Sequence, residues 1–446
     1  MQSLLLERLL GNVTPLHLQS VIIDNNYSSI YQSAISNVFP LNCHKNASVN
    51  SLSLDSIDYQ FLLSGCGDSS IKLWDLNQQE ITGKPSEIDS KLNKNPKNYD
   101  TFDYDNPIST FTNIATIPRK THHKFGISAL QWWPYDTGMF VSSSFDHTIK
   151  IWDTNELKPV HSFNLNQRIY SIDVNGENSL ISTANDHPFI RLLDLKSTSS
   201  SHTLSGHKGK TLSVKWHPIN SNLLASGGLD GEVKIWDIRR SKSCLCRLDM
   251  LRTNDQVEDV YNLKKTSVKA HSGPVNGLIW DELGSILYTA GNDDKVRVWD
   301  MISKTYPPTN KLINFGPLTR NKYSQTIPIL LNPKNEILTQ RYLIFPSDSS
   351  DILIFRTNDG KLQTRLTRKG TKNIGRTCSM ISGKPNNTQI ICGTIDGEII
   401  NWLPYYEQPN IENLIEEEEE EMDIEEQILR KHKLALQGQS LMNNEV

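Results

Sequence analysis

The chain has 446 residues, of which 37% are hydrophobic and 22% charged, and its formal net charge is −4 at pH 7. Without an overall positive field, a general electrostatic grip on nucleic acid is not the expected mode of action. No apolar run approaches the roughly 20 residues that span a membrane. Glu7 and Arg8 interrupt the amino-terminal leucines, which argues against a secretory signal. We therefore expect a soluble intracellular protein.

The amino-terminal residues 1–36 are predicted to be a helical docking segment. Ser3 stands at the N-cap position of a short helix and Gly11 just past its end, and a second helix is expected from Leu16 to Ile23. One apolar stripe of the first helix consists of Leu5, Leu6, Leu9 and Leu10. A helix this short is marginal alone, so its leucines must lie on another surface. That surface is either the rest of the chain or a groove of a partner, and both alternatives stay open.

An internal repeat follows. Four segments alternate apolar and charged residues before a Trp-Asp pair, which is the period of a strand buried on one face. Each has an Asp six residues before the Trp and a His 28 to 30 residues before it. The repeated residues are His44, Asp68 and Trp74; His123, Asp146 and Trp152; His207, Asp230 and Trp236; and His271, Asp293 and Trp299.

This pattern resembles the WD repeat, which implies a four-stranded blade. The His, the turn Asp, a Ser or Thr and the Trp can form a hydrogen-bonded network that satisfies polar groups buried inside each blade. We therefore assign these histidines to the structure and neither to catalysis nor to a metal site.

Three weaker repeats complete the series. They run from Ser182 to Asp194, from Tyr342 to Phe355 and from Gly393 to Trp402. Blade ends then fall near residues 75, 153, 194, 237, 300, 355 and 402. We predict an all-β fold, a seven-bladed WD40 β-propeller over residues 37–409, because a closed ring leaves no exposed sheet edge.

Two polar stretches depart from the repeat. Trp74 and Trp152 are 78 positions apart, against about 40 to 45 residues for one blade. The surplus lies in about 77–120, where composition predicts a loop hanging from the ring, and a second excursion covers Ser241 to Lys269. The residues 410–446 form an acidic tail, helical or disordered, with Glu416 to Glu421 as its most acidic run. The tail is either a solvated face or a docking element for a basic partner.

Enzyme chemistry is not expected. The sequence has no phosphate-binding loop, nucleophile elbow or zinc-protease motif. The six cysteines show no CxxC spacing and no neighbouring His ligands, so we expect reduced thiols and no metal or cofactor. The cysteines are Cys43, Cys66, Cys244, Cys246, Cys378 and Cys392. Function is then expected to be recognition across the faces of the ring.

The second blade is more specific than the others. Its run from Trp132 to Asn155, in the form WxPxDTGMFxSSSFDxTxKxWDTN, strongly resembles the Cockayne syndrome A family. The stretches Leu223 to Arg240, Asn314 to Gly316 and Trp402 to Pro409 support this resemblance, which covers roughly residues 40 to 409. The Asn- and Lys-rich insertions resemble those of a divergent fungal member.

The resemblance implies a substrate receptor of a cullin-RING (CUL4-DDB1-type) ubiquitin ligase, held by the adaptor damage-specific DNA-binding protein one (DDB1). It implies a non-catalytic role in transcription-coupled nucleotide-excision repair in the nucleus, beside a SWI/SNF-type repair ATPase and stalled RNA polymerase II. The alternative is a non-ligase WD40 scaffold that binds a repair ATPase, RNA polymerase II or chromatin. No sequence-specific nucleic-acid contact and no membrane are expected.

The resemblance also implies where the adaptor docks. The first element is the amino-terminal segment with Leu5, Leu6, Leu9 and Leu10; the second is a WDxR box formed by Trp236, Asp237 and Arg239. An Arg is a frequent binding anchor because its planar fork suits carboxylates and carbonyls. The alternative for Arg239 is an ion pair within the chain. For Trp133 and Tyr135 two locations stay open: a binding surface or the core of a blade.

Overall fold

A computed structural model describes most of the chain. The described residues are 8–11, 14–15, 17–19, 21–23, 25–27, 41–42, 47–81, 109–240, 244–253, 268–302, 308–332, 341–367, 376–383 and 388–402. The acidic tail, Leu5, Leu6 and His44 lie outside them.

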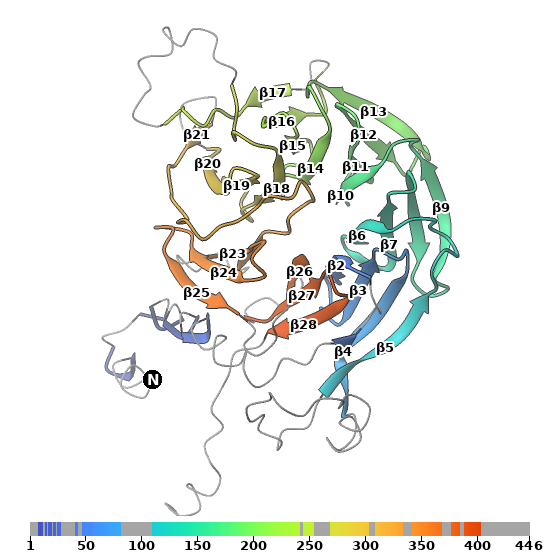
Figure 1. The fold of residues 1–446 in the computed structure, drawn as a ribbon, viewed down its shortest axis with the longest axis horizontal. Helices are drawn as coiled ribbons and strands as arrows, with labels where there is room; N and C mark the ends of the chain where they lie inside the picture. Colours follow the sequence, from blue (N-terminus) through green and yellow to red (C-terminus); the bar gives the residue numbers. More distant parts are fainter. Residues whose placement is uncertain are drawn as a thin grey trace, which may run out of the picture. The chain divides into compact units, whose positions relative to one another are not determined.

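The described strands form seven four-stranded antiparallel sheets that follow one another around a ring (Figure 1). Each sheet is one blade, and its strands run from the inner strand beside the ring axis to the outer strand at the rim. The prediction of a seven-bladed propeller is confirmed.

The first four blades take their strands in chain order. Blade 1 consists of β2 (Val49–Leu54), β3 (Phe61–Cys66), β4 (Ile71–Ile81) and β5 (Ser109–Ile117). Blade 2 consists of β6 (Ile127–Trp133), β7 (Asp136–Ser144), β8 (Thr148–Asp153) and β9 (Lys158–Asn164). Blade 3 consists of β10 (Ile169–Asn175), β11 (Leu180–Asn185), β12 (Phe189–Asp194) and β13 (Ser199–Ser205). Blade 4 consists of β14 (Thr211–Trp216), β15 (Leu223–Gly228), β16 (Val233–Asp237) and β17 (Cys244–Arg247).

The last three blades include the closure of the ring. Blade 5 consists of β18 (Val275–Trp280), β19 (Ile286–Gly291), β20 (Lys295–Asp300) and β21 (Thr309–Asn310). Blade 6 consists of β22 (Leu330–Asn332), β23 (Tyr342–Pro346), β24 (Ile352–Arg356) and β25 (Leu362–Leu366). Blade 7 consists of β26 (Thr377–Ser382), β27 (Ile390–Thr394), β28 (Glu398–Trp402) and, as its outer strand, β1 (Leu41–Asn42).

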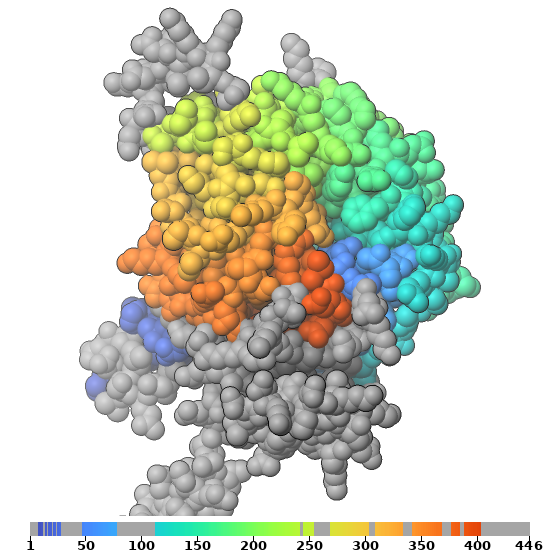
Figure 2. Space-filling model, viewed as in Figure 1, coloured from blue at the N-terminus to red at the C-terminus, as the bar shows by residue number. Residues whose placement is uncertain are grey.

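The strand β1 ties the two ends of the propeller together. It precedes blade 1 in the chain yet pairs with β28, so that Leu41 lies opposite Ile399. In the space-filling view the red surface of blade 7 meets the blue surface of blade 1 (Figure 2). A strand that precedes blade 1 in the chain thus completes the sheet of the last blade and covers the edge that β28 would otherwise leave free.

The hydrophobic core is divided among the junctions between blades. Seven clusters of buried side chains lie between successive blades, including one between blades 7 and 1 that contains Leu62 and Ile391. Hydrogen bonds from indole N–H groups also orient neighbouring blades relative to each other. Trp132 donates to the Ser53 carbonyl at 3.1 Å and Trp216 to the Asp173 carbonyl at 3.1 Å. Each donor lies on an inner strand and each acceptor on the inner strand of the preceding blade, so the bonds set the angle between neighbours.

Both predicted insertions are shorter than expected. β4 continues to Ile81 and β5 covers Ser109–Ile117, so the loop predicted over about 77–120 is wrong at both ends. In the second excursion β17 (Cys244–Arg247) is the outer strand of blade 4. Each outer strand is stabilised by pairing with the third strand of its blade, whose backbone groups need partners, and the composition of the surrounding stretch does not reveal this.

The amino-terminal segment has helical turns at residues 8–9 and between 15 and 27. Gly11 ends the first turn with a φ of +79°, as its position predicted, and its N–H donates to the Arg8 carbonyl at 3.1 Å. Thr14 caps the second, because its hydroxyl accepts from the His17 N–H at 3.3 Å. Among the described residues, no helix is long and apolar enough to cross a membrane.

Tyr27 anchors the second helical segment on the propeller. Its side chain is fully buried in the cluster between blades 6 and 7, with its ring 4.3 Å from that of Tyr342. Its carbonyl accepts a hydrogen bond from the Thr364 hydroxyl on β25 at 3.0 Å, and Ile23 packs against the same cluster. Burial raises the pKa of the Tyr27 phenol. Tyr27 and Ile23 therefore join the end of this segment to the core of the ring.

Replacing Tyr27 with Ala is expected to release this segment. The loss of a buried aromatic costs about 3–5 kcal/mol, so amide exchange over residues 15–27 rises by about tenfold or more while the blades stay protected. Hydrogen–deuterium exchange with mass spectrometry measures this. Leu9→Ala is the control, because Leu9 is 85% exposed and its removal leaves the exchange unchanged. Equal exchange in Tyr27→Ala and the parent protein would contradict the anchoring role.

Candidate functional site

The repeated His, Asp and Trp residues meet inside blades 2, 4 and 5. In blade 2 the His123 imidazole contacts the Asp146 carboxylate at 3.0 Å through Nδ1 and the Ser142 hydroxyl at 2.7 Å through Nε2. The Trp152 indole donates to the same hydroxyl at 2.7 Å. Blade 4 repeats the network with His207, Asp230, Ser226 and Trp236, and blade 5 with His271, Asp293, Thr289 and Trp299.

Within the described ranges, which leave out His44 of blade 1, the other blades show only parts of this network. In blade 1 the Trp74 indole donates to the Ser64 hydroxyl at 2.9 Å, and Asp68 binds the Ser70 hydroxyl and N–H. Blade 3 uses its turn Asp differently, because Asp186 pairs with Lys210. In blade 7 the corresponding Asp396 is exposed. The degenerate repeats therefore keep the backbone of a blade without its buried polar chain.

The turn carboxylates are held in the charged form. Burial by itself raises the pKa of Asp230, but hydrogen bonds from His207 and from the backbone N–H groups of Lys208 and Glu232 lower it to about 2. Burial is likewise outweighed at Asp146 by hydrogen bonds from His123 and Thr148, and at Asp293 by hydrogen bonds from His271 and Arg297, so the pKa of both carboxyls is lowered. Burial lowers the pKa of His271. These groups are arranged for stability and face the interior of a blade.

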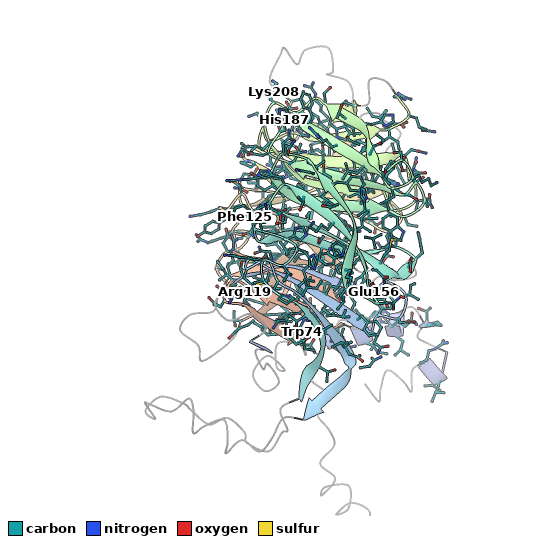
Figure 3. All side chains as sticks on the ribbon, turned by 90° about the vertical axis from the view of Figure 1, so that its right-hand side faces the viewer. Trp74, Arg119, Phe125, Glu156, His187 and Lys208 are labelled. Carbon is teal, nitrogen blue, oxygen red and sulfur yellow. The ribbon has the colours of Figure 1, made fainter. Side chains whose placement is uncertain are left out.

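A blade with four antiparallel strands has two ends, and these define two faces of the ring. The turns between first and second strands and between third and fourth strands form the lower face. The turns between second and third strands, with the links between blades, form the upper face. Arg119, Phe125, His187 and Lys208 accordingly lie along one edge of the disc, and Glu156 lies at the opposite edge (Figure 3).

Arg239 lies on the lower face, where the Asp of each Trp-Asp pair caps the following turn. Asp237 accepts the Arg239 N–H at 3.0 Å, and Asp75, Asp153, Asp194 and Asp300 do the same for the residue two positions on. The Arg239 guanidinium also binds Asp237 through Nε at 3.1 Å and Nη2 at 2.9 Å. The expected ion pair within the chain is thus present, yet the Arg239 side chain remains 64% exposed.

The WDxR residues differ in what they can contact. Trp236 is completely buried and Asp237 is 3% exposed, so neither is a direct docking contact. Trp236 belongs to the network of blade 4, and Asp237 orients Arg239. The hydrogen bonds from Arg239 hold the pKa of Asp237 below its usual range. Only the guanidinium of the predicted box is available to a partner.

The lower face also carries apolar side chains that the repeat pattern does not reveal. The tips of four first-to-second-strand turns expose one large hydrophobic residue each. They are Ile57, Tyr135, Ile219 and Leu283, and Tyr135 is 77% exposed. Ile302, in the turn between the third and fourth strands of blade 5, is 70% exposed on the same face. Tyr135 is therefore surface, whereas Trp133 is 8% exposed and belongs to the core. Turns favour polar residues, so an apolar residue at the tip of a turn was the sequence signal that could have revealed these exposed side chains.

The described amino-terminal leucines are also at the surface. Leu9 is 85% exposed and Leu10 is 68% exposed, so the described part of the stripe does not pack on the propeller. Leu5 and Leu6 lie outside the described residues. The leucine stripe was expected to pack either on the rest of the chain or in a groove of a partner. For Leu9 and Leu10, packing on the ring does not hold.

No cluster of reactive groups is found within the described ranges. The five described cysteines are free thiols, and burial raises the pKa of Cys66 to about 12. Among these residues, no group of three or more His, Cys, Asp or Glu side chains is placed to hold a metal ion.

The turn carboxylate of blade 4 predicts a measurable acid dependence. Because the folded pKa of Asp230 lies below its unfolded value of about 3.9, its contribution of about 2 kcal/mol is present at neutral pH and is lost as pH falls toward 2. Asp230→Asn should therefore have a lower melting temperature than the parent protein at pH 7, and its melting temperature should fall less steeply as pH drops below about 4. Asp396→Asn, at the equivalent exposed turn position, is the matched control in thermal melts and should follow the parent protein. Identical pH profiles for both variants would rule out the proposed contribution.

Comparison with known proteins supports the repeat assignment. The family model "WD domain, G-beta repeat" matches residues 35–75, 113–153, 198–237 and 262–300. These ranges contain the four strong repeats. The three degenerate blades were identified from weaker spacing and are completed by the structure.

Two relatives bear on the family. Radiation-sensitive protein 28 of Saccharomyces cerevisiae is 30% identical over 267 residues, and the match covers 55% of this chain and 52% of the relative. The chain thus spans about half the length of that protein. WD repeat-containing protein ATCSA-1 of Arabidopsis thaliana is 26% identical over 422 residues, covering 80% of this chain and 85% of the relative. A match to a ribosome biogenesis protein WDR12 homolog of Culex quinquefasciatus is 31% identical and covers 42% of this chain and 41% of the relative. The resemblance detected in blade 2 is confirmed, and the chain is a seven-bladed WD-repeat propeller related to the Cockayne syndrome A family.

Proposed function

We propose that this protein is the substrate-receptor subunit of a cullin-RING ubiquitin ligase of the CUL4-DDB1 type, acting in transcription-coupled nucleotide-excision repair in the nucleus. The family relationship supports a role in DNA repair, in keeping with the name of Radiation-sensitive protein 28. The observation that carries the docking role is the exposure of Leu9 and Leu10 ahead of a helical segment fixed by Tyr27.

The anchored segment suits docking because its two ends behave differently. Tyr27 is buried in the ring, whereas Leu9 and Leu10, fewer than twenty residues earlier, are exposed. A leucine pair in water gains free energy when a partner covers it, at about 25 cal/mol per Å² of apolar surface. An apolar helical face that enters a groove of the adaptor is the interaction these residues favour.

Arg239 supplies the polar part of the same interface. Its guanidinium is preoriented by two hydrogen bonds to Asp237, so little side-chain freedom is lost when a partner binds. The exposed edge of the fork can donate to carbonyl or carboxylate groups of the adaptor. Arg239 in turn compensates the charge of the buried Asp237 carboxylate in the free protein, which makes the arrangement stable before docking.

The apolar turn tips extend the interface around the lower face. Tyr135, Ile219 and Leu283 come from blades 2, 4 and 5, and Ile302 adds a second apolar tip in blade 5. Scattered exposed hydrophobic residues are common, but one at each of several equivalent turns of one face indicates a binding surface. In this proposal the adaptor covers the lower face and the substrate or repair partner approaches the upper face.

The docking proposal is tested with purified full-length protein and DDB1 by biolayer interferometry. Leu9→Asp with Leu10→Asp, and separately Arg239→Ala, should weaken binding by about tenfold or more, since anchor residues contribute about 1.4 kcal/mol or more. Asn155→Ala is the matched control, because Asn155 holds the position of Arg239 in blade 2 and its loss should leave affinity unchanged. Unchanged thermal melting shows that the variants fold.

Cells give the second test. The tagged protein should recover the cullin and its adaptor before and after ultraviolet damage, and the Leu9→Asp, Leu10→Asp and Arg239→Ala variant should lose both. Mass spectrometry identifies the partners. Recovery of a SWI/SNF-type ATPase or RNA polymerase II subunits without any cullin would overturn the ligase role and establish the scaffold alternative.

A further inference from the structure

The upper face of blades 2 to 4 carries a surplus of positive charge. The turns and links 118–126, 144–148, 165–170, 185–189, 205–210 and 229–231 contain six Lys or Arg residues and three Asp residues. We call this surface the basic–aromatic arc. Its cations are Arg119, Lys120, Lys124, Arg168, Lys208 and Lys210. The arc is locally positive although the whole chain has a formal charge of −4.

The acidic residues of the arc are already engaged. Asp146 and Asp230 are tied to His123 and His207, and their side chains are 5% and 9% exposed. Asp186 pairs with Lys210 at 2.5 Å. Arg119 lies 3.9 Å from Asp68. Among the described residues, Lys124, Arg168 and Lys208 have no carboxylate partner, so their charges are presented to solvent.

The blade networks hold two of these cations in place. Lys124 follows His123 in the chain, and its N–H donates to Asp146 at 2.8 Å. Lys208 follows His207 in the same way and donates to Asp230 at 3.0 Å. In blade 5 the equivalent residue is Ser272, so the positive arc ends at blade 4. The backbone of each Lys is fixed before any partner arrives, which lowers the entropy cost of binding.

Exposed aromatic rings lie among the cations. Phe125, directly after Lys124, is 61% exposed. Phe189 is 40% exposed and stacks on His187 with ring centres 4.7 Å apart. Nearer the ring axis, Phe145 meets Tyr170 edge to face at 6.4 Å, and both line the central cavity of about 600 Å³. Phe125 and His187 project on the same edge of the disc as Arg119 and Lys208 (Figure 3).

We propose that the basic–aromatic arc binds a linear acidic segment of a partner protein, in which carboxylates alternate with apolar or aromatic side chains. The carboxylates pair with Lys124, Arg168 and Lys208, and the apolar side chains cover Phe125 and Phe189. This inference goes beyond the proposed function, because it uses the face opposite Arg239 and does not require the ligase adaptor.

An acidic peptide fits this surface better than a nucleic acid does. A nucleic-acid strand has a charge about every 3.4 Å and would cross the carboxylates that lie between the cations. Asp186 is 33% exposed among them, and the surplus of the arc is only three charges. A peptide can place neutral or apolar residues at those points and acidic residues opposite the unpaired cations.

The test is selection of a random dodecapeptide phage library on the immobilised full-length protein. Peptides rich in Asp and Glu, interleaved with Phe, Leu or Trp, should be enriched, and fluorescence anisotropy gives the affinity of the leading peptide. The triple variant Lys124→Glu, Arg168→Glu and Lys208→Glu should bind that peptide at least tenfold more weakly. The control makes the same charge change on the lower face, Lys158→Glu with Lys196→Glu and Lys361→Glu, and should retain binding. Thermal melts verify that both triple variants fold.

Three results would overturn the proposal: no enrichment of acidic peptides, equal loss in both triple variants, or tighter binding of a twenty-nucleotide single-stranded DNA than of the leading peptide. The last would assign the arc to nucleic acid. The Leu9→Asp, Leu10→Asp and Arg239→Ala variant should keep full peptide affinity while losing DDB1. Failure of the arc and failure of the ligase role are therefore distinguishable.

Discussion

The buried chain from turn Asp through His and Ser or Thr to Trp organises this protein. In blade 4 it runs from Asp230 through His207 and Ser226 to Trp236. Each member satisfies a polar group that burial would otherwise leave without a partner, and together they link an inter-blade loop, a turn and the third strand. Because the same Asp also receives the N–H of Lys208, the network that stabilises a blade also fixes its upper surface.

The lower face depends on the same strands. The Asp that follows the buried Trp caps the next turn, and in blade 4 it also holds the guanidinium of Arg239. The two faces therefore differ in chemistry while sharing a scaffold: the lower face offers apolar turn tips with one oriented Arg, and the upper arc offers cations among aromatic rings. A ring with two distinct faces can hold two partners at once.

Closure of the ring makes this division stable. The pairing of β1 with β28 joins the first and last blades, and an apolar cluster fills every junction between neighbours. Tyr27 then adds the amino-terminal segment to the junction of blades 6 and 7, so a region far from the axis shares the core. Leu9 and Leu10, earlier in the same part of the chain, are exposed.

The sequence by itself determined the repeat, the number of blades, the network residues of blades 2, 4 and 5, and the resemblance to one family. These depend on local periods: strand alternation, and the spacing of His, Asp and Trp within one blade. Only the tertiary structure decided that residues 109–117 and 244–247 are outer strands, and that β1 belongs to blade 7. It alone separated Tyr135 at the surface from Trp133 in the core, and Arg239 from its buried neighbours. Strand pairing and exposure depend on contacts between residues far apart in the chain, which local patterns do not encode.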